Sequence, residues 1–134
     1  AAVVLFLAAC DSKVDPLLIT ADDYCDVNAP RGEVDKKEEI MAWGWAFDKS
    51  NATIPEEVIL QIISEDKVNG VRIPLNRDSR PDLAKAFNLP IEMGGFKTNI
   101  DLKTLPAGVY SVSVVQRTKG RILLCNSNFK VVLK

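Results

Sequence analysis

The sequence predicts an all-β domain, an antiparallel β-sandwich with one short helix inserted at about residues 80–88. Two observations carry this prediction. Apolar runs of strand length recur between turn signals from residue 24 onward, and a single segment departs from that rhythm with a helical pattern. At 134 residues, 47% of them hydrophobic and 26% charged, the chain suits one ordinary folded domain and is too short for two.

Seven segments have the length and composition of strands, and turn residues such as Asn69-Gly70 and Lys119-Gly120 separate several of them. The last segment alternates apolar and polar residues, as a half-buried strand does. This spacing is typical of an Ig-like sandwich. The predicted strands are Ile40–Phe47, Val58–Ser64, Val71–Leu75, Phe96–Leu102, Val109–Val115, Ile122–Cys125 and Phe129–Leu133.

The first of these strands carries large side chains on one face and mostly small ones on the other. The large face holds Met41, Trp43, Trp45 and Phe47, and the other holds Ile40, Ala42, Gly44 and Ala46. We expect the large face to form the core, because such an apolar stripe is more often core. The alternative is that the two tryptophans form a platform for stacking sugars. We expect the short helix to cover the small face.

Residues 79–82 (Ser-Arg-Pro-Asp) have the form of a capping box with proline in the first turn. Leu83 and Phe87 then fall on one helical stripe. A helix from about Arg80 to Asn88 is therefore expected, with Asp82 capping it and Arg80 paired to a neighbouring oxygen. The alternative role for Arg80 is to bind a carboxylate or phosphate ligand.

The N-terminal segment predicts export. Residues 1–9 are entirely apolar and end at Cys10, which matches the end of a signal peptide that is removed. Residues 7–10 (Leu-Ala-Ala-Cys) resemble a bacterial lipobox, which implies that Cys10 is acylated, with palmitate among its acyl chains, and anchors the protein to a membrane. The alternatives are an ordinary secretory signal and a buried first strand.

Residues 10–23 are expected to be the lipidated cysteine and a short tether, with the sandwich spanning residues 24–134. The anchor predicts a lipoprotein of the bacterial cell envelope that faces the periplasm. Asp11 directly after the lipidated cysteine resembles an inner-membrane retention signal.

Cys25 and Cys125 form an even pair once Cys10 is lipidated, which in an exported chain predicts a disulfide. The bridge would close a loop of about 100 residues and contribute roughly 4.7 kcal/mol to stability. Two free buried thiols are the alternative.

Composition argues against several functions. The sequence contains no His, which removes His-based catalytic pairs and His-ligated zinc sites. The net charge of −1 gives no basic excess for nucleic acid. We therefore expect no enzyme activity, no cofactor, no metal and no nucleic-acid partner.

The charged residues between 67 and 80 are the remaining binding candidates. Arg72, Arg77, Arg80 and Asp82 lie in or beside this segment, which we expect to be a long loop. An exposed loop of this kind can enter the active site of an enzyme, so one hypothesis is an envelope inhibitor of a hydrolase.

Four motifs occur in a specific order: Gly-Trp-Ala-Phe-Asp at 44–48, Arg-Pro-Asp-Leu-Ala at 80–84, Gly-Phe at 95–96 and Leu-Pro-Ala-Gly at 105–108. This order resembles Ig-like β-sandwich modules of bacterial cell-envelope proteins, with Leu83 in place of the usual Val. The resemblance implies the fold and the extracytoplasmic location. The leading hypothesis is a noncatalytic lipid-anchored module that binds a glycan or an envelope protein, with the hydrolase inhibitor as the alternative.

Overall fold

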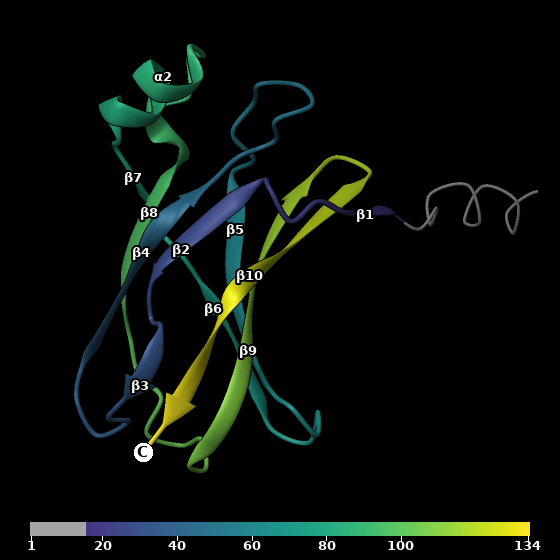
Figure 1. Ribbon diagram of the computed structural model, residues 1–134. Helices are drawn as coiled ribbons and strands as arrows, with labels where there is room; N and C mark the ends of the chain where they lie inside the picture. Colours follow the sequence, from purple (N-terminus) through teal and green to yellow (C-terminus); the bar gives the residue numbers. More distant parts are fainter. Residues whose placement is uncertain (1–15) are drawn as a thin grey trace, which may run out of the picture.

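The computed structural model describes residues 16–134 and contains two β-sheets packed face to face (Figure 1). The elements are β1 Leu17–Thr20, β2 Cys25–Ala29, β3 Gly32–Val34, β4 Ile40–Ala46, β5 Glu57–Ser64, β6 Gly70–Pro74, β7 Arg77–Asp78, α2 Pro81–Phe87, the 3-10 helix η1 Glu92–Gly94, β8 Gly95–Ile100, β9 Gly108–Thr118 and β10 Arg121–Leu133. One sheet has the order β1-β10-β9-β5-β6, with β3 also paired to β10, and the other has the order β2-β4-β8-β7. The predicted Ig-like β-sandwich with one short helix is confirmed.

All seven predicted strands are present, and the last two form one continuous strand. The register of β10 against β9 shifts between Asn126 and Lys130, around the gap between the two predicted segments. Four further strands, β1, β2, β3 and β7, are absent from the prediction. β1 falls within the segment expected to be a tether and pairs in parallel with β10.

The core lies between the sheets and is built from the inward residues of both. Tyr110 at the start of β9 is among the largest side chains in it, and its hydroxyl donates to the Pro106 carbonyl at 2.7 Å. A tyrosine that bonds back to the backbone just upstream is a hallmark of Ig-like sandwiches. This bond holds the Leu-Pro-Ala-Gly segment against the start of β9.

The orientation of β4 is opposite to the one predicted. Ala42 and Ala46 are fully buried in the core, whereas Met41 and Trp43 are 38% and 41% exposed on the outer face. The reason lies at Gly44, where an added Cβ would stand 2.2 Å from the Asp26 carbonyl oxygen of β2 and 3.0 Å from the Phe96 ring. Only glycine at this position lets these neighbours approach so closely.

The helix α2 also packs elsewhere than predicted. It covers the large residues at one end of the outer face of β4, and not the small face. The Phe87 ring lies 5.2 Å from both the Trp45 and the Phe47 rings, in edge-on arrangements. Leu83 and Ile91 complete this second small core. The small face needs no helix, because it lies inside the sandwich.

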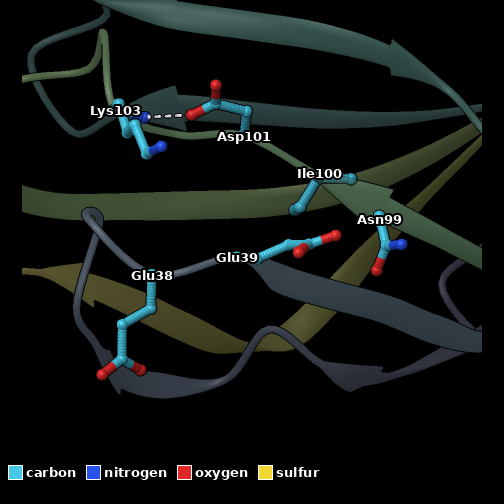
Figure 2. Close-up of a pocket in the computed structure, with 6 residues that line it drawn as sticks. All are labelled: Glu38, Glu39, Asn99, Ile100, Asp101 and Lys103. Atoms are coloured by element: carbon cyan, nitrogen blue, oxygen red, sulfur yellow. Dashed lines mark hydrogen bonds between the residues drawn. The ribbon is translucent and has the colours of Figure 1, made fainter.

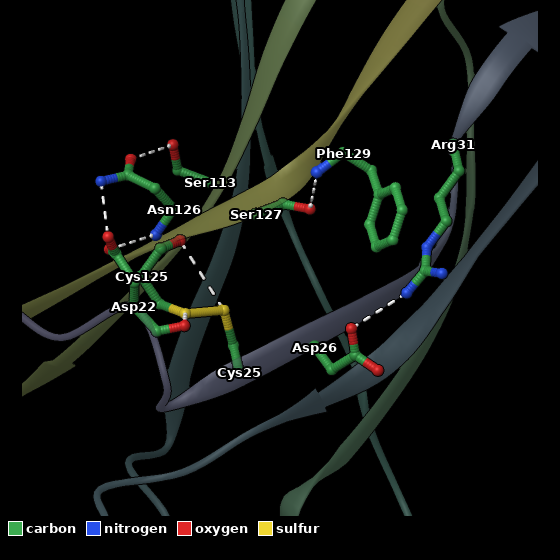
Figure 3. Close-up of a disulfide and its surroundings, with 9 residues drawn as sticks. All are labelled: Asp22, Cys25, Asp26, Arg31, Ser113, Cys125, Asn126, Ser127 and Phe129. Carbon is green, nitrogen blue, oxygen red and sulfur yellow. Dashed lines mark hydrogen bonds and ion pairs between the residues drawn. A yellow bond between two sulfur atoms is a disulfide. The ribbon is translucent and has the colours of Figure 1, made fainter.

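The disulfide between Cys25 and Cys125 is present, as predicted, with a sequence separation of 100. It joins β2 of one sheet to β10 of the other (Figure 3). Beside it, the Asp22 side chain accepts hydrogen bonds from the backbone and side-chain nitrogens of Asn126. The bridge and these bonds hold the start of the domain to its last strand.

Gly44→Ala should lower the free energy of unfolding by about 3 kcal/mol, because the added methyl group has no room against Asp26 and Phe96. Urea unfolding followed by tryptophan fluorescence measures this change. Gly94→Ala is the matched control, since its Cβ would meet no atom nearer than 3.6 Å. Equal stability of the two variants would contradict the packing described for β4.

Replacing both Cys25 and Cys125 with alanine should lower the free energy of unfolding by about 4 kcal/mol, because the unfolded chain regains the freedom of a 100-residue loop. The urea midpoint with and without reductant measures the effect. Reductant should lower the midpoint of the parent chain and leave that of the double variant unchanged. Alkylation of both thiols in the oxidised native protein would refute the bridge.

Candidate functional site

The uncovered part of the outer face of β4 is the candidate site. Trp43 and Met41 lie there opposite Lys97 and Asn99 of β8 in the strand register. Exposed large apolar side chains that gather on a sheet face mark interaction surfaces. Trp45 is excluded from this surface, because Phe87 covers it. The two tryptophans therefore differ: Trp45 is covered by α2, whereas Trp43 is exposed to solvent.

A shallow hollow of about 470 Å³ surrounds Trp43. Its walls come from β4, β7, β8 and the residue that precedes α2, so segments far apart in the sequence meet there. An apolar floor with a few charged groups at its rim is the usual make-up of a ligand-binding hollow. The lining residues are Met41, Trp43, Asp78, Arg80, Phe96 and Lys97.

Arg80 is held in place at the rim of this hollow. Its Nε and Nη2 donate to the two carboxylate oxygens of Asp82 at 2.9 and 2.8 Å. Its stem packs on Gly95, where an added Cβ would lie 2.3 Å from the Arg80 Cγ. The guanidinium carbon lies 5.9 Å from the centre of the Trp43 ring, within range of a cation–π contact. Arg80 is therefore a fixed cation beside the exposed indole.

The expected capping box is wrong. Arg80 occupies the N-cap position of α2, and no side chain caps the helix with a hydrogen bond. Asp82 instead accepts both hydrogen bonds from Arg80, because the bidentate geometry suits a guanidinium and a carboxylate. This hydrogen bonding lowers the pKa of Asp82 and raises the pKa of Arg80. Asp82 thus orients Arg80, and the pair stays ionised at neutral pH.

Two other charged groups of the hollow have no ion-pair partner between residues 16 and 134. These are the Lys97 ammonium and the Asp78 carboxylate. Lys97 is solvent-exposed and directly opposite Trp43 in the register. Asp78 lies near enough to Arg80 for its charge to contribute to the raised pKa of Arg80. The hollow therefore offers a donor and an acceptor beside the aromatic ring.

The other arginines named from the sequence lie apart from this site. Arg77 donates to the carbonyls of Ala46, Pro55 and Gly94 and to the Gln116 side chain, so its donors are used inside the fold. Burial lowers the pKa of Arg77 to about 10, which still leaves it charged at neutral pH. Arg72 lies on the outer face of the opposite sheet and donates to Gln61. The structure thus brings only Arg80 and Asp82 together.

The segment 67–80 is not a long loop. It contains β6 and β7, and its main exposed apolar residue is Val68, which lies in the turn between β5 and β6 with 76% of its surface exposed. The backbone hydrogen bonds of the two strands explain the difference, because they tie the segment to β5 and β8.

A second hollow of about 280 Å³ lies at the far end of β8, and its walls are mostly polar (Figure 2). Glu38 and Glu39 come from the same turn, but Figure 2 shows their side chains pointing in different directions. Asp101 accepts a hydrogen bond from the Lys103 backbone nitrogen. Within the described part of the chain, no group of three acidic, Cys or His side chains is placed to hold a metal ion.

Sequence reasoning missed Lys97, Asp78 and Met41 as site residues, because their meeting depends on which face of β4 points outward. The signal that could have found them was Gly44 with Ala42 and Ala46 two positions away on either side, on the same strand face, which marks the face that packs closely.

No helix between residues 16 and 134 is long and apolar enough to cross a membrane.

Comparison with models of known protein families finds no match to this chain, and no curated protein matches it significantly.

Proposed function

We propose that this protein is a noncatalytic module of the bacterial cell envelope that binds a glycan on the Trp43 hollow. The observation that carries the proposal is the position of Trp43, 41% exposed on a rigid sheet and flanked by charged groups. An indole offers a flat apolar surface on which the C–H face of a sugar ring can stack. Polar groups at the rim can then hydrogen-bond the hydroxyl groups.

The rim groups support a sugar more than a purely apolar ligand. Lys97 donates, Asp78 accepts, and Arg80 is held by Asp82 in one position. Such mixed donors and acceptors suit hydroxyl groups, which both donate and accept. Because Trp43 lies in the middle of a hydrogen-bonded strand, little conformational freedom is lost when a ligand stacks on it.

The proposal includes no catalytic step. The hollow is lined by a single carboxylate, Asp78, whereas glycoside hydrolysis ordinarily needs two. The sequence also has no His to act as a general base.

The alternative function, inhibition of a hydrolase, has less support. It required a long projecting segment at 67–80, and half of that segment is held in strands. Only the short turn that carries Val68 remains to insert into an active site.

The proposed location is the periplasmic side of a membrane, with the protein anchored through acylated Cys10 and retained at the inner membrane by Asp11. Both residues lie outside the described residues, so the support comes from the sequence pattern of residues 1–11. The Cys25–Cys125 disulfide agrees with an oxidising compartment such as the periplasm.

Trp43→Ala should weaken glycan binding at least about tenfold, because the stacking surface is lost while the exposed position tolerates the change. An array of bacterial surface glycans identifies the ligand, and titration calorimetry with that glycan measures its affinity. Trp43→Phe should retain part of the affinity.

Phe129→Ala is the matched control for Trp43→Ala, because Phe129 is an aromatic residue of similar exposure, 46%, on β10. It should bind the glycan as the parent does. Equal binding by the parent and Trp43→Ala, or an array without any signal, would refute the proposal.

Cys10→Ala should abolish incorporation of a fatty-acid analogue in a bacterial host, because acylation requires the Cys10 thiol. In-gel fluorescence after metabolic labelling measures incorporation. The Cys25→Ala/Cys125→Ala variant is the control and should remain labelled, since those sulfurs form the disulfide. Label retained after Cys10→Ala would contradict the proposed anchor.

A further inference from the structure

The outer face of the sheet β1-β10-β9-β5-β6 carries an apolar patch at its β1 end. Leu18 pairs with Ile122, Leu124 with Val115, and Val115 with Ile59, so these side chains lie together on the solvent side. The outer face of an antiparallel sheet is ordinarily polar. The patch, named here the β1 patch, consists of Leu18, Ile59, Pro74, Val115, Ile122 and Leu124.

The β1 patch is open to solvent and slightly concave. A hollow of about 320 Å³ lies over it, and Leu18 is 60% exposed at its margin. The neighbouring Leu17 is 62% exposed, but it pairs with Arg121, so its side chain points to the other face of the strand. Leu18 gains little from folding at this exposure, and covering it with something apolar would be favourable.

Positive charge surrounds the β1 patch. Arg72 and Arg117 line the hollow, and Lys119 lies at the tip of the β9–β10 hairpin. All three are exposed. The nearest carboxylate on this face is Glu57, 3.8 Å from Arg117. Among the described residues that line or border the patch, three cations against one carboxylate leave a basic rim around an apolar floor.

The chain approaches the patch from the direction of Cys10. The Leu17 backbone nitrogen donates to the Gly120 carbonyl at 2.8 Å, so β1 begins beside the tip of the β9–β10 hairpin, as Figure 1 shows. Leu17 lies seven positions after Cys10, and this stretch spans at most about 25 Å when fully extended. This step depends on the proposed lipid anchor, which would keep the β1 patch within that distance of the bilayer.

We infer that the β1 patch docks on the surface of an anionic phospholipid bilayer. Leu18 and its apolar neighbours in the patch enter the headgroup region, and Arg72, Arg117 and Lys119 contact lipid phosphates. A second copy of the chain fits less well, because two copies facing each other would bring the basic rims together. The Trp43 hollow lies on the opposite sheet, so docking turns it away from the membrane.

Vesicle sedimentation tests this inference with the chain from residue 10 onward carrying Cys10→Ser. This protein retains every described residue and lacks the acyl chains and residues 1–9, which are apolar enough to enter vesicles themselves. We expect binding to vesicles that contain phosphatidylglycerol and much weaker binding to pure phosphatidylcholine. Added salt should weaken the binding.

Two double variants locate the contact. Leu18→Ser/Ile122→Ser should lower the partition coefficient at least about tenfold. Arg72→Gln/Arg117→Gln should lower it roughly fivefold per arginine, which corresponds to about 1 kcal/mol for each cation near the surface. The second variant keeps β1 unchanged, so it tests the surface even if the first disturbs the edge strand. Circular dichroism checks that both variants fold.

Trp43→Ala and Phe129→Ser are the controls, since both remove an exposed aromatic side chain away from the patch. Both should bind vesicles as the parent does, so a failure of the glycan proposal would not affect this result. The inference is overturned by equal binding to neutral and anionic vesicles, by no binding, or by double variants that bind like the parent. A dimer in ultracentrifugation that Leu18→Ser/Ile122→Ser dissociates, without vesicle binding, would assign the patch to a second copy instead.

Discussion

The close approach of the Asp26 carbonyl to Gly44 determines the arrangement of the second sheet. A side chain at residue 44 would collide with the backbone of β2, and the buried Phe96 ring of the core packs directly over Gly44, so this face of β4 is the inner one. Because alternate residues of a strand point to opposite sides, Met41, Trp43 and Trp45 are then on the outer face. The helix α2 covers the Trp45 end with Phe87, and the Trp43 end stays open. The exposure of Trp43 at the candidate site thus follows from the absence of a side chain at Gly44.

The strands of this protein were predictable from the sequence, but the direction in which β4 faces was not. Apolar length and turn residues are local signals, and they located all the longer strands. In β4 both faces are apolar, so the pattern of polarity does not tell inside from outside. The deciding contact comes from Asp26, eighteen positions earlier in the chain. The position of Arg80 was not predictable either, because its side chain packs on Gly95, which is distant in the sequence. Residues 79–82 indicated a helix cap, but Arg80 instead donates hydrogen bonds to Asp82.

β10 is the strand on which the two ends of the described chain converge. It pairs in parallel with β1 and β3 and antiparallel with β9, and it carries Cys125. Short edge strands such as β1 and β3 have weak sequence signals, because most of their stability comes from a partner far along the chain. This explains why part of the expected tether forms a strand. It also fixes Leu17 and Leu18 to the sandwich, so their exposure is a property of the fold and not of a loose end.

The two sheets separate the two proposed surfaces. The Trp43 hollow belongs to β4 and β8, the β1 patch belongs to the other sheet, and the buried core lies between them. Changes at one surface should leave the other unaffected, since well-separated sites without shared partners act independently. The geometry also implies an orientation of the anchored protein relative to the membrane. A chain held at its N-terminal side, with the β1 patch against lipid, would present Trp43, Lys97 and Arg80 to the periplasm. A polysaccharide too large to enter the narrow space beside the membrane could then reach the aromatic face.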